Sequence, residues 1–135
     1  MINSEELARA FPVVNPGVKP LGARVLIQLR TVIERTKSGI VLPEDTKQFN
    51  KANTQLGKVV DLGAIAFCNR DTGTTWREGV WARHGDFVRV PKWGGDRFER
   101  LIPGTQEKAI FCIFSDHEII AKVDPEAFEE LDEVL

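Results

Sequence analysis

Several residue types on which enzymes and secreted proteins depend are scarce in this chain of 135 residues. Tyrosine is absent, and there are only two histidines, three serines, one methionine and two cysteines. Cys68 and Cys112 stand far apart, which predicts neither a disulfide framework nor a metal-binding pair. The longest wholly apolar run, Ala109 to Phe114, is six residues and too short to span a bilayer. The first residues do not resemble a secretory signal, so we expect a soluble, cytoplasmic protein without membrane contact.

Motifs that carry catalysis or bind nucleotides are also missing. The chain has no Gly-x-Ser-x-Gly, no His-Glu-x-x-His and no phosphate-binding Gly-x-x-x-x-Gly-Lys-[Ser/Thr] sequence. Asp116, His117 and Glu118 could supply acid–base chemistry, but a polar turn between two strands is the favoured interpretation because no nucleophile accompanies them. A zinc site needs at least three ligands close together. We expect no catalytic residue, no metal and no cofactor.

The charges are nearly balanced along the whole chain but unevenly placed. Eighteen basic and twenty acidic residues give a formal net charge of −2. A protein that binds nucleic acid by neutralising phosphates needs a strong basic excess, so the balance argues against a nucleic-acid partner. The last twelve residues, 124–135, contain six acids and no base, which leaves +4 for residues 1–123.

Short segments of alternating polarity dominate the body of the chain. Val25, Ile27 and Leu29 share one face of a predicted half-buried strand, and polar residues alternate with them. The other predicted strands are separated by glycine- and proline-containing turns: Lys58–Leu62, Asp86–Val90, Arg97–Ile102, Ala109–Phe114 and Glu118–Val123. Ala109–Phe114 is apolar on both faces and should be the most buried. Many short strands with regular turns predict an all-β barrel or sandwich.

The segments outside these strands divide the chain into three parts. Residues 1–17 form an N-terminal extension, with a short helix over 4–11 and a linker over 13–17. Residues 18–123 form one domain, in which 64–82 suit a long hairpin with a Thr/Gly tip. Residues 124–135 form an acidic tail in which a short amphipathic helix is expected.

Residues 31–56 form a long, mostly polar segment with one apolar island, Ile40-Val41-Leu42. Such a segment in a compact domain is functional or contains an unrecognised element. On periodicity the island is a buried strand in an ordinary loop; on length and flanking polarity it is a linear anchor for a groove on a partner. Composition alone does not decide between these interpretations.

The order of several motifs resembles one known family. Val18-Lys19-Pro20-Leu21-Gly22-Ala23-Arg24-Val25-Leu26-Ile27-Gln28, followed after nine residues by Ser38-Gly39-Ile40-Val41-Leu42, resembles the signature of the 10 kDa chaperonin (GroES) family. Further segments follow in the expected order: Leu56–Gly63, His84–Val88, Lys92–Gly95 and Ser115–Val123. The resemblance covers roughly residues 18–123.

This resemblance implies a fold and a function that composition and periodicity do not. The fold is a GroES-like, partly open β-barrel with a mobile loop (31–56), a roof hairpin (64–82) and short terminal extensions. The function is that of a co-chaperonin: a homo-oligomeric ring, a heptamer in this family, that caps a GroEL-type chaperonin and encloses unfolded substrate protein. The protein is then not an enzyme, and nucleotide binds the partner chaperonin.

The resemblance also implies roles for particular residues. Gly39 would permit the turn of the docking hairpin, and Ile40, Val41 and Leu42 would bind between two helices of the chaperonin. Two stretches would pair across neighbouring subunits and close the ring. Their residues are Val18, Lys19, Pro20, Leu21, Ile119, Ile120, Ala121 and Val123.

Three features depart from the family pattern. Ala23 replaces an acidic or amide residue, residues 64–82 are longer and more aromatic than the usual roof hairpin, and both termini are extended. These departures suggest a divergent member of the family, with a viral gene as one conceivable source. They also keep one alternative open, an oligomerisation or assembly module of the same fold without a chaperonin partner. A third hypothesis, a small β-barrel enzyme or nucleic-acid binder, has the missing catalytic motifs and the near-neutral charge against it.

Overall fold

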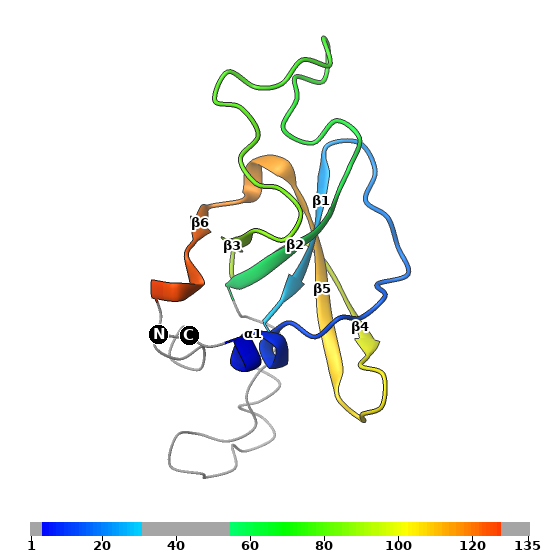
Figure 1. The fold of residues 1–135 in the computed structure, drawn as a ribbon. Coiled ribbons are helices and arrows are strands. Elements are labelled where there is room, and N and C mark those ends of the chain that lie inside the picture. The colour runs from blue at the N-terminus through cyan, green and yellow to red at the C-terminus, as the bar shows by residue number, and fades with distance from the viewer. Residues whose placement is uncertain (1–3, 31–54, 128–135) are drawn as a thin grey trace.

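The structure is a computed structural model that describes residues 4–30 and 55–127 (Figure 1). Six strands form its body, with one short helix before them and two 3-10 turns near the end. The elements are α1 (Ser4–Ala10), β1 (Arg24–Leu29), β2 (Leu56–Leu62), β3 (Phe87–Arg89), β4 (Asp96–Leu101), β5 (Lys108–Ser115), η1 (Asp116–Glu118), β6 (Ala121–Val123) and η2 (Pro125–Ala127).

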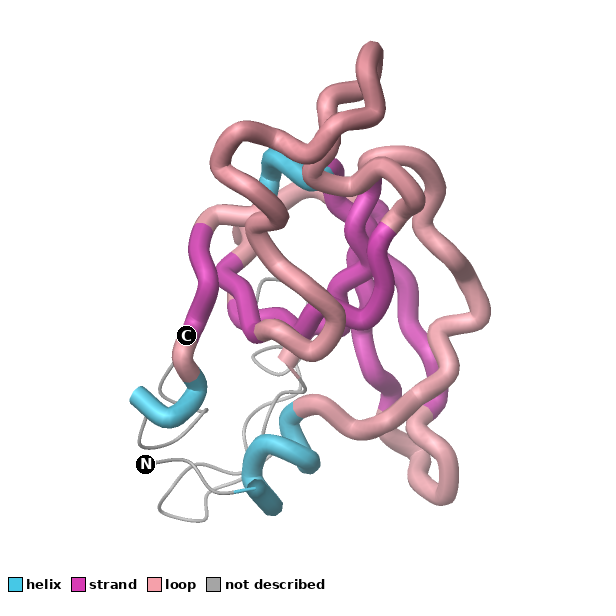
Figure 2. Tube along the Cα trace, turned by 45° about the horizontal axis from the view of Figure 1, so that its top comes forward, coloured by secondary structure: helices cyan, strands magenta, loops and turns pink. Residues whose placement is uncertain are grey.

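The six strands form one antiparallel sheet in the order β4-β5-β1-β2-β3-β6. The sheet curves strongly, as Figure 2 shows, but within the described residues it does not close, because β4 and β6 are its two edges. The predicted all-β class is therefore confirmed, with a partly open barrel as its form.

The interior face of the sheet forms the main hydrophobic core. It contains the alternating apolar residues of β1, Val25, Ile27 and Leu29, each fully buried. β5 carries apolar residues on both faces and is buried along most of its length, as expected for the most apolar strand. A register shift between Leu26 and Ile27, where β1 pairs with β2, adds to the local twist of the sheet.

The exterior face of β1 is also covered, which the sequence pattern did not predict. Gln28 and Arg30, expected on a solvated face, are only 4% and 2% exposed. Leu26 on the same strand lies in a second cluster with Phe111, and Val14 packs against it. The half-buried interpretation of β1 was wrong because residues from the N-terminal extension lie over its outer face.

We call residues 4–17 the N-terminal strap. Its helix α1 ends at Ala10, one residue before the expected end and ahead of Pro12, and the segment predicted as a linker, 13–17, runs along the sheet (Figure 1). Two backbone carbonyls anchor it: Pro12 O accepts a hydrogen bond from Gln28 Nε2 at 2.8 Å, and Pro16 O accepts one from Arg100 Nε at 2.8 Å.

The segment from 64 to 82 contains the expected hairpin. Cys68 and Thr75 form an isolated antiparallel bridge, and Trp76 N donates to Phe67 O at 2.9 Å. Trp76 and Trp81 lie edge to face with their ring centres 4.8 Å apart, and both contact Phe67. The two tryptophans therefore pack within the hairpin and over the main core.

The last predicted strand is shorter than expected. The pattern predicted a strand over Glu118–Val123, whereas Asp116–Glu118 form the turn η1 and only Ala121–Val123 pair with β3. The turn places Ile119 in the main core, 6% exposed. Pro125 begins η2, and the rest of the predicted acidic helix lies outside the described residues. Among the helices that the structure describes, none is long and apolar enough to cross a membrane.

Candidate functional site

The four residues predicted to dock on a chaperonin, Gly39, Ile40, Val41 and Leu42, lie outside the described residues. The structure does describe the residues on either side of their segment. We call the end of β1 with Arg30 the N-terminal stem, and Gln55 with the start of β2 the C-terminal stem. Arg30 N donates to Leu56 O at 3.0 Å, and the preceding pair in the ladder is Leu29 opposite Gly57. The chain therefore leaves β1 and returns to β2 at adjacent points, which lie on the two sides of residues 31–54.

The C-terminal stem is held by a second strand. Val90 N donates to Gln55 O at 2.8 Å, and Gln55 Nε2 donates to Val90 O at 3.3 Å. Arg89 also donates from its guanidinium to Gln55 Oε1 at 3.1 Å. Gln55, directly before β2, is thus joined by its backbone and its side chain to Arg89 and Val90 at the end of β3.

Gly57 keeps the two stems close together. A Cβ atom added at this position would collide with the side chain of Ile27 and would touch Leu29 Cδ2 at 3.7 Å. Both contacts lie on β1. Only glycine lets β2 approach β1 this closely at the base of the loop.

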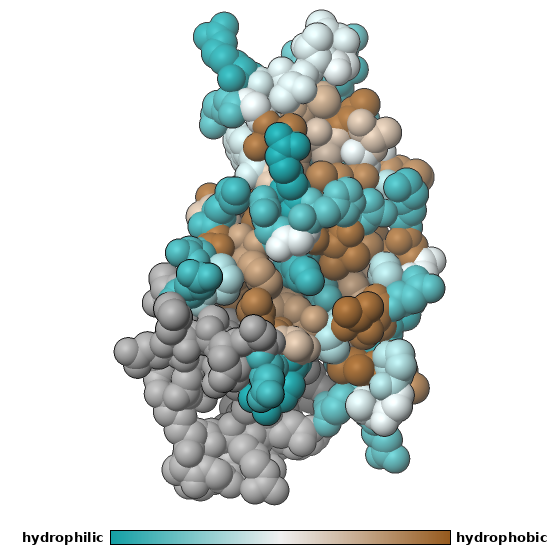
Figure 3. All heavy atoms as spheres, in the orientation of Figure 1, coloured by the Kyte–Doolittle hydropathy of each residue, from teal (hydrophilic) through white to brown (hydrophobic). Residues whose placement is uncertain are grey.

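The residues predicted to form subunit contacts divide into exposed and buried ones. Val18, Leu21 and Ile120 are exposed apolar side chains, at 38%, 70% and 56%. Pro20 and Ile119 are buried within their own chain. Within the described residues, the two predicted stretches form no ladder with each other, and β6, which holds Ala121 and Val123, is an edge strand. On the face shown in Figure 3, brown apolar side chains alternate with teal polar ones over the body.

Lys19 ties one of these stretches to β2. Its Nζ lies 3.5 Å from Asp61 Oδ2, and His84 Nε2 lies 3.2 Å from Asp61 Oδ1. Burial alone would raise the pKa of Asp61, but hydrogen bonds from His84 and from the Leu62 N–H, with the charge of Lys19, outweigh it and lower that pKa. The carboxylate is therefore charged at neutral pH, and its stabilising contribution is lost only as the pH falls through the lowered pKa.

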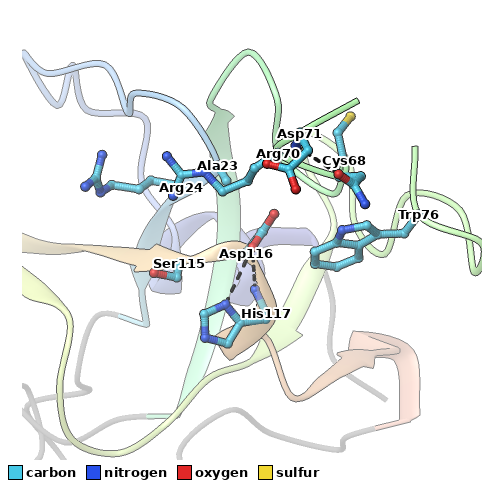
Figure 4. Close-up of a pocket in the computed structure, with 10 residues that line it drawn as sticks. Ala23, Arg24, Cys68, Arg70, Asp71, Trp76, Ser115, Asp116 and His117 are labelled. Carbon is cyan, nitrogen blue, oxygen red and sulfur yellow. Dashed lines mark hydrogen bonds and ion pairs between the residues drawn. The ribbon is translucent and has the colours of Figure 1, made fainter. Parts of the chain in front are cut away.

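Asp116 and His117 border a surface pocket of about 460 Å³ between the hairpin and the junction of β5 with η1 (Figure 4). Asp116 is 4% exposed; its Oδ2 accepts a hydrogen bond from Phe67 N at 2.9 Å, and its Oδ1 accepts one from His117 N at 2.8 Å. Both oxygens thus hold backbone in place, which supports the structural interpretation of this motif over the acid–base one. Arg24, Arg70 and Asp71 also line the pocket, so opposite charges balance around it.

Among the residues that the structure describes, no three His, Cys, Asp or Glu side chains gather as metal ligands would. Cys68 and Cys112 are both free thiols. Burial raises the pKa of the Cys112 thiol to about 11, which Arg97 only partly opposes.

Comparison with known proteins identifies a family whose model spans the six strands of the sheet. The sequence model of the family described as "Chaperonin 10 Kd subunit" matches residues 17–123, from before β1 to the end of β6. The chain belongs to the chaperonin 10 kDa subunit family. The N-terminal strap lies almost entirely before the matched region.

Several curated relatives are named "Co-chaperonin GroES". The protein from Listeria monocytogenes is 34% identical over 104 residues, which cover 77% of this chain and 96% of the relative. The one from Coprothermobacter proteolyticus is 35% identical over 109 residues, covering 81% and 97%. The one from Symbiobacterium thermophilum is 40% identical over 78 residues, covering 58% and 72%. A co-chaperonin role is thus supported at the level of the family, which is not a family of enzymes.

Two features near the loop of this GroES family member were missed by reasoning from the sequence. A helix over 4–11 and a linker over 13–17 were expected, and neither was expected to lie on the sheet, although Phe11 is 4% exposed and contacts Phe87 at 5.1 Å between ring centres. Gln28 was placed on a solvated face, although it is buried against Pro12. The available signals were the apolar residues Phe11 and Val14, which a solvated extension does not need.

Proposed function

We propose that this protein is a co-chaperonin whose ring caps an ATP-driven, GroEL-type chaperonin and encloses substrate protein for folding. Ile40, Val41 and Leu42 are the residues that dock in the partner's groove, with Gly39 at the turn. The observation that carries the proposal is the family match over residues 17–123, which includes this motif between two stems closed at their base.

Ring formation is supported by the distribution of apolar surface in the single chain. Val18, Leu21 and Ile120 are apolar side chains that are 38%, 70% and 56% exposed in the single chain, and contact with another copy would remove them from water. Among the strands that the structure describes, β6 is at the edge of the sheet, which a strand from another copy would cover. A closed cyclic assembly satisfies every such edge, and we propose the heptamer that is typical of the family.

The energetics suit a reversible lid. Burying three aliphatic side chains contributes about 1.5–3 kcal/mol each. Ordering a segment on binding costs about 2–5 kcal/mol or more, so one loop alone binds weakly. Several loops on one ring raise the affinity about 10²–10⁴-fold by multivalency. Because the net term per loop is small, modest changes in the partner's groove release the ring, and nucleotide control belongs to the partner.

Native mass spectrometry tests the proposal. The protein is measured alone, and then with a bacterial-type chaperonin with and without ADP or ATP. We expect a ring of about seven subunits that joins the chaperonin only with nucleotide. Ile40→Asp should abolish joining while leaving the ring intact, because a charge cannot enter an apolar groove unpaired.

Val13→Asp is the matched control, since Val13 is 94% exposed and lies before the family match. It should join the chaperonin as the wild type does. Retained binding by Ile40→Asp would refute the docking assignment. A stable ring that ignores every chaperonin offered would refute the lid function and favour the assembly module, and a monomer would refute the ring.

A further inference from the structure

We propose that Phe11 of the N-terminal strap is a positioning residue for the docking loop. Together with Pro12 it holds the strand from which the loop leaves and the strand to which it returns. This inference rests on the proposed function, because it assigns a task to the strap in presenting residues 40–42. The strap precedes the region that matches the family, so the task belongs to this chain's own extension.

Phe11 packs on the C-terminal stem. Ala10, Phe11 and Leu56 are 4%, 4% and 3% exposed and form one cluster. Leu56 is the first residue of β2 and comes directly after Gln55, the first described residue beyond the loop. The Phe11 ring also lies edge to face on Phe87 of β3, with ring centres 5.1 Å apart. Phe11 therefore fills the corner where the returning chain joins β2 and β3.

Pro12 holds the N-terminal stem. Its carbonyl accepts the 2.8 Å hydrogen bond from Gln28 Nε2, and Gln28 is 4% exposed on β1, two residues before Arg30. A buried amide that loses its acceptor is costly, so this bond fixes the strap on β1. Consecutive strap residues thus contact both strands that flank the loop. Figures 1 and 2 place α1 at the end of the sheet where β1 ends and β2 begins.

The closing bond of the loop depends on this packing. Arg30 N donates to the carbonyl of Leu56, which belongs to the same cluster as Phe11. If Phe11 is truncated, the cluster around Leu56 loses its largest buried side chain, and the last pair of the β1–β2 ladder opens more often. Residues released at the base must be ordered again when the loop docks, which weakens binding. The strap therefore preorganises the loop from its base.

Phe11→Ala is compared with Phe98→Ala, a truncation of the same kind. Phe98 is half-buried on β4 and stacks on Phe111 at 5.5 Å, in a cluster separate from that of Phe11. Both variants should lower stability in urea and keep the ring. The first measurement is amide hydrogen exchange of Arg30 in the ring, followed by NMR. We expect at least about tenfold faster exchange in Phe11→Ala and little change in Phe98→Ala.

The second measurement is binding of each ring to a bacterial-type chaperonin with ADP. We expect Phe11→Ala to bind about tenfold or more weakly than Phe98→Ala, since a small loss in each loop is multiplied over the ring. Phe11→Leu should show exchange and binding close to those of the wild type, because it keeps an apolar side chain in the corner. If Phe11→Ala does not fold, Phe11→Leu replaces it and must show smaller changes of the same sign.

Failure of the inference and failure of the proposed function give different results. Equal exchange and equal binding in Phe11→Ala and Phe98→Ala, with Ile40→Asp inactive, would overturn the positioning role and leave the lid function intact. If the wild-type ring does not bind or Ile40→Asp binds normally, the docking assignment fails. The exchange of Arg30 then still decides whether Phe11 holds the base of the loop.

Discussion

Replacing Asp116 by alanine should detach the hairpin over residues 64–82 from the sheet. The carboxylate accepts the buried N–H of Phe67 and the half-buried N–H of His117. A hydrogen bond to a charged group contributes about 1.5–3 kcal/mol, and a buried donor left without an acceptor costs about 1–3 kcal/mol. The Phe67 bond counts fully, whereas the His117 bond counts for less because it is only partly buried. We therefore expect the free energy of unfolding to fall by about 2–4 kcal/mol.

That loss is a large share of the stability of a small domain, which is about 5–15 kcal/mol. Phe67 is also the one non-glycine residue with a positive φ, 62°, among the described residues, so its conformation depends on the bond to Asp116. Trp76 and Trp81 pack on Phe67, and their fluorescence should therefore shift toward that of solvent-exposed indole.

Urea unfolding followed by circular dichroism measures the loss, and tryptophan fluorescence reports the hairpin. Asp116→Asn retains one acceptor oxygen and should lose about half as much. Asp96→Ala removes an exposed carboxylate on β4 and should change stability by less than about 0.5 kcal/mol. If Asp116→Ala costs no more than Asp96→Ala, the two hydrogen bonds do not anchor the hairpin and the reasoning is wrong.

Two further predictions concern the surroundings of Cys112. Gly95→Ala should cost more than about 2 kcal/mol, because φ is +74° and the added methyl would collide with Cys112 Sγ and the Phe114 ring; Gly94→Ala, with φ of +89° and open space around it, should cost only the backbone term of about 1–2 kcal/mol. Equal losses in urea unfolding would contradict the packing argument. In the native protein at pH 8, iodoacetamide should modify half-buried Cys68 well before Cys112, whose pKa is about 11. Mass spectrometry of the peptides measures the rate at which each cysteine is alkylated, and equal rates for Cys68 and Cys112 would refute the prediction.

The elements that depend on local pattern were predicted well. Alternation of polar and apolar residues located β1, a short apolar run between turns located β5, and the Thr/Gly tip indicated the hairpin. The helix before Pro12 ended where proline ends helices. Errors appeared where a neighbour distant in sequence decided the outcome. Gln28 looked solvated because nothing near it in the sequence indicates that the carbonyl of Pro12 would cover it.

For the candidate site, too, some features could be predicted from the sequence and others could not. The order of motifs in the sequence pointed to the family, and the matched region of residues 17–123 confirmed it. The roles of Gly39–Leu42 and of the subunit contacts stay predictions. Asp116 was recognised as a turn residue, but its bond to Phe67, 49 positions away, could not be read from the sequence.

The sequence by itself determined the fold class, the family and the positions of most strands, since the alternation of side-chain polarity and the chemistry of turns act over a few residues. The tertiary structure alone decided that the strap lies on the sheet and that Arg100 holds Pro16 across 84 positions. It also decided that Ile119 turns inward while Ile120 stays exposed. These outcomes depend on which surfaces remain uncovered once the sheet has curved, and that is a property of the whole chain rather than of any segment.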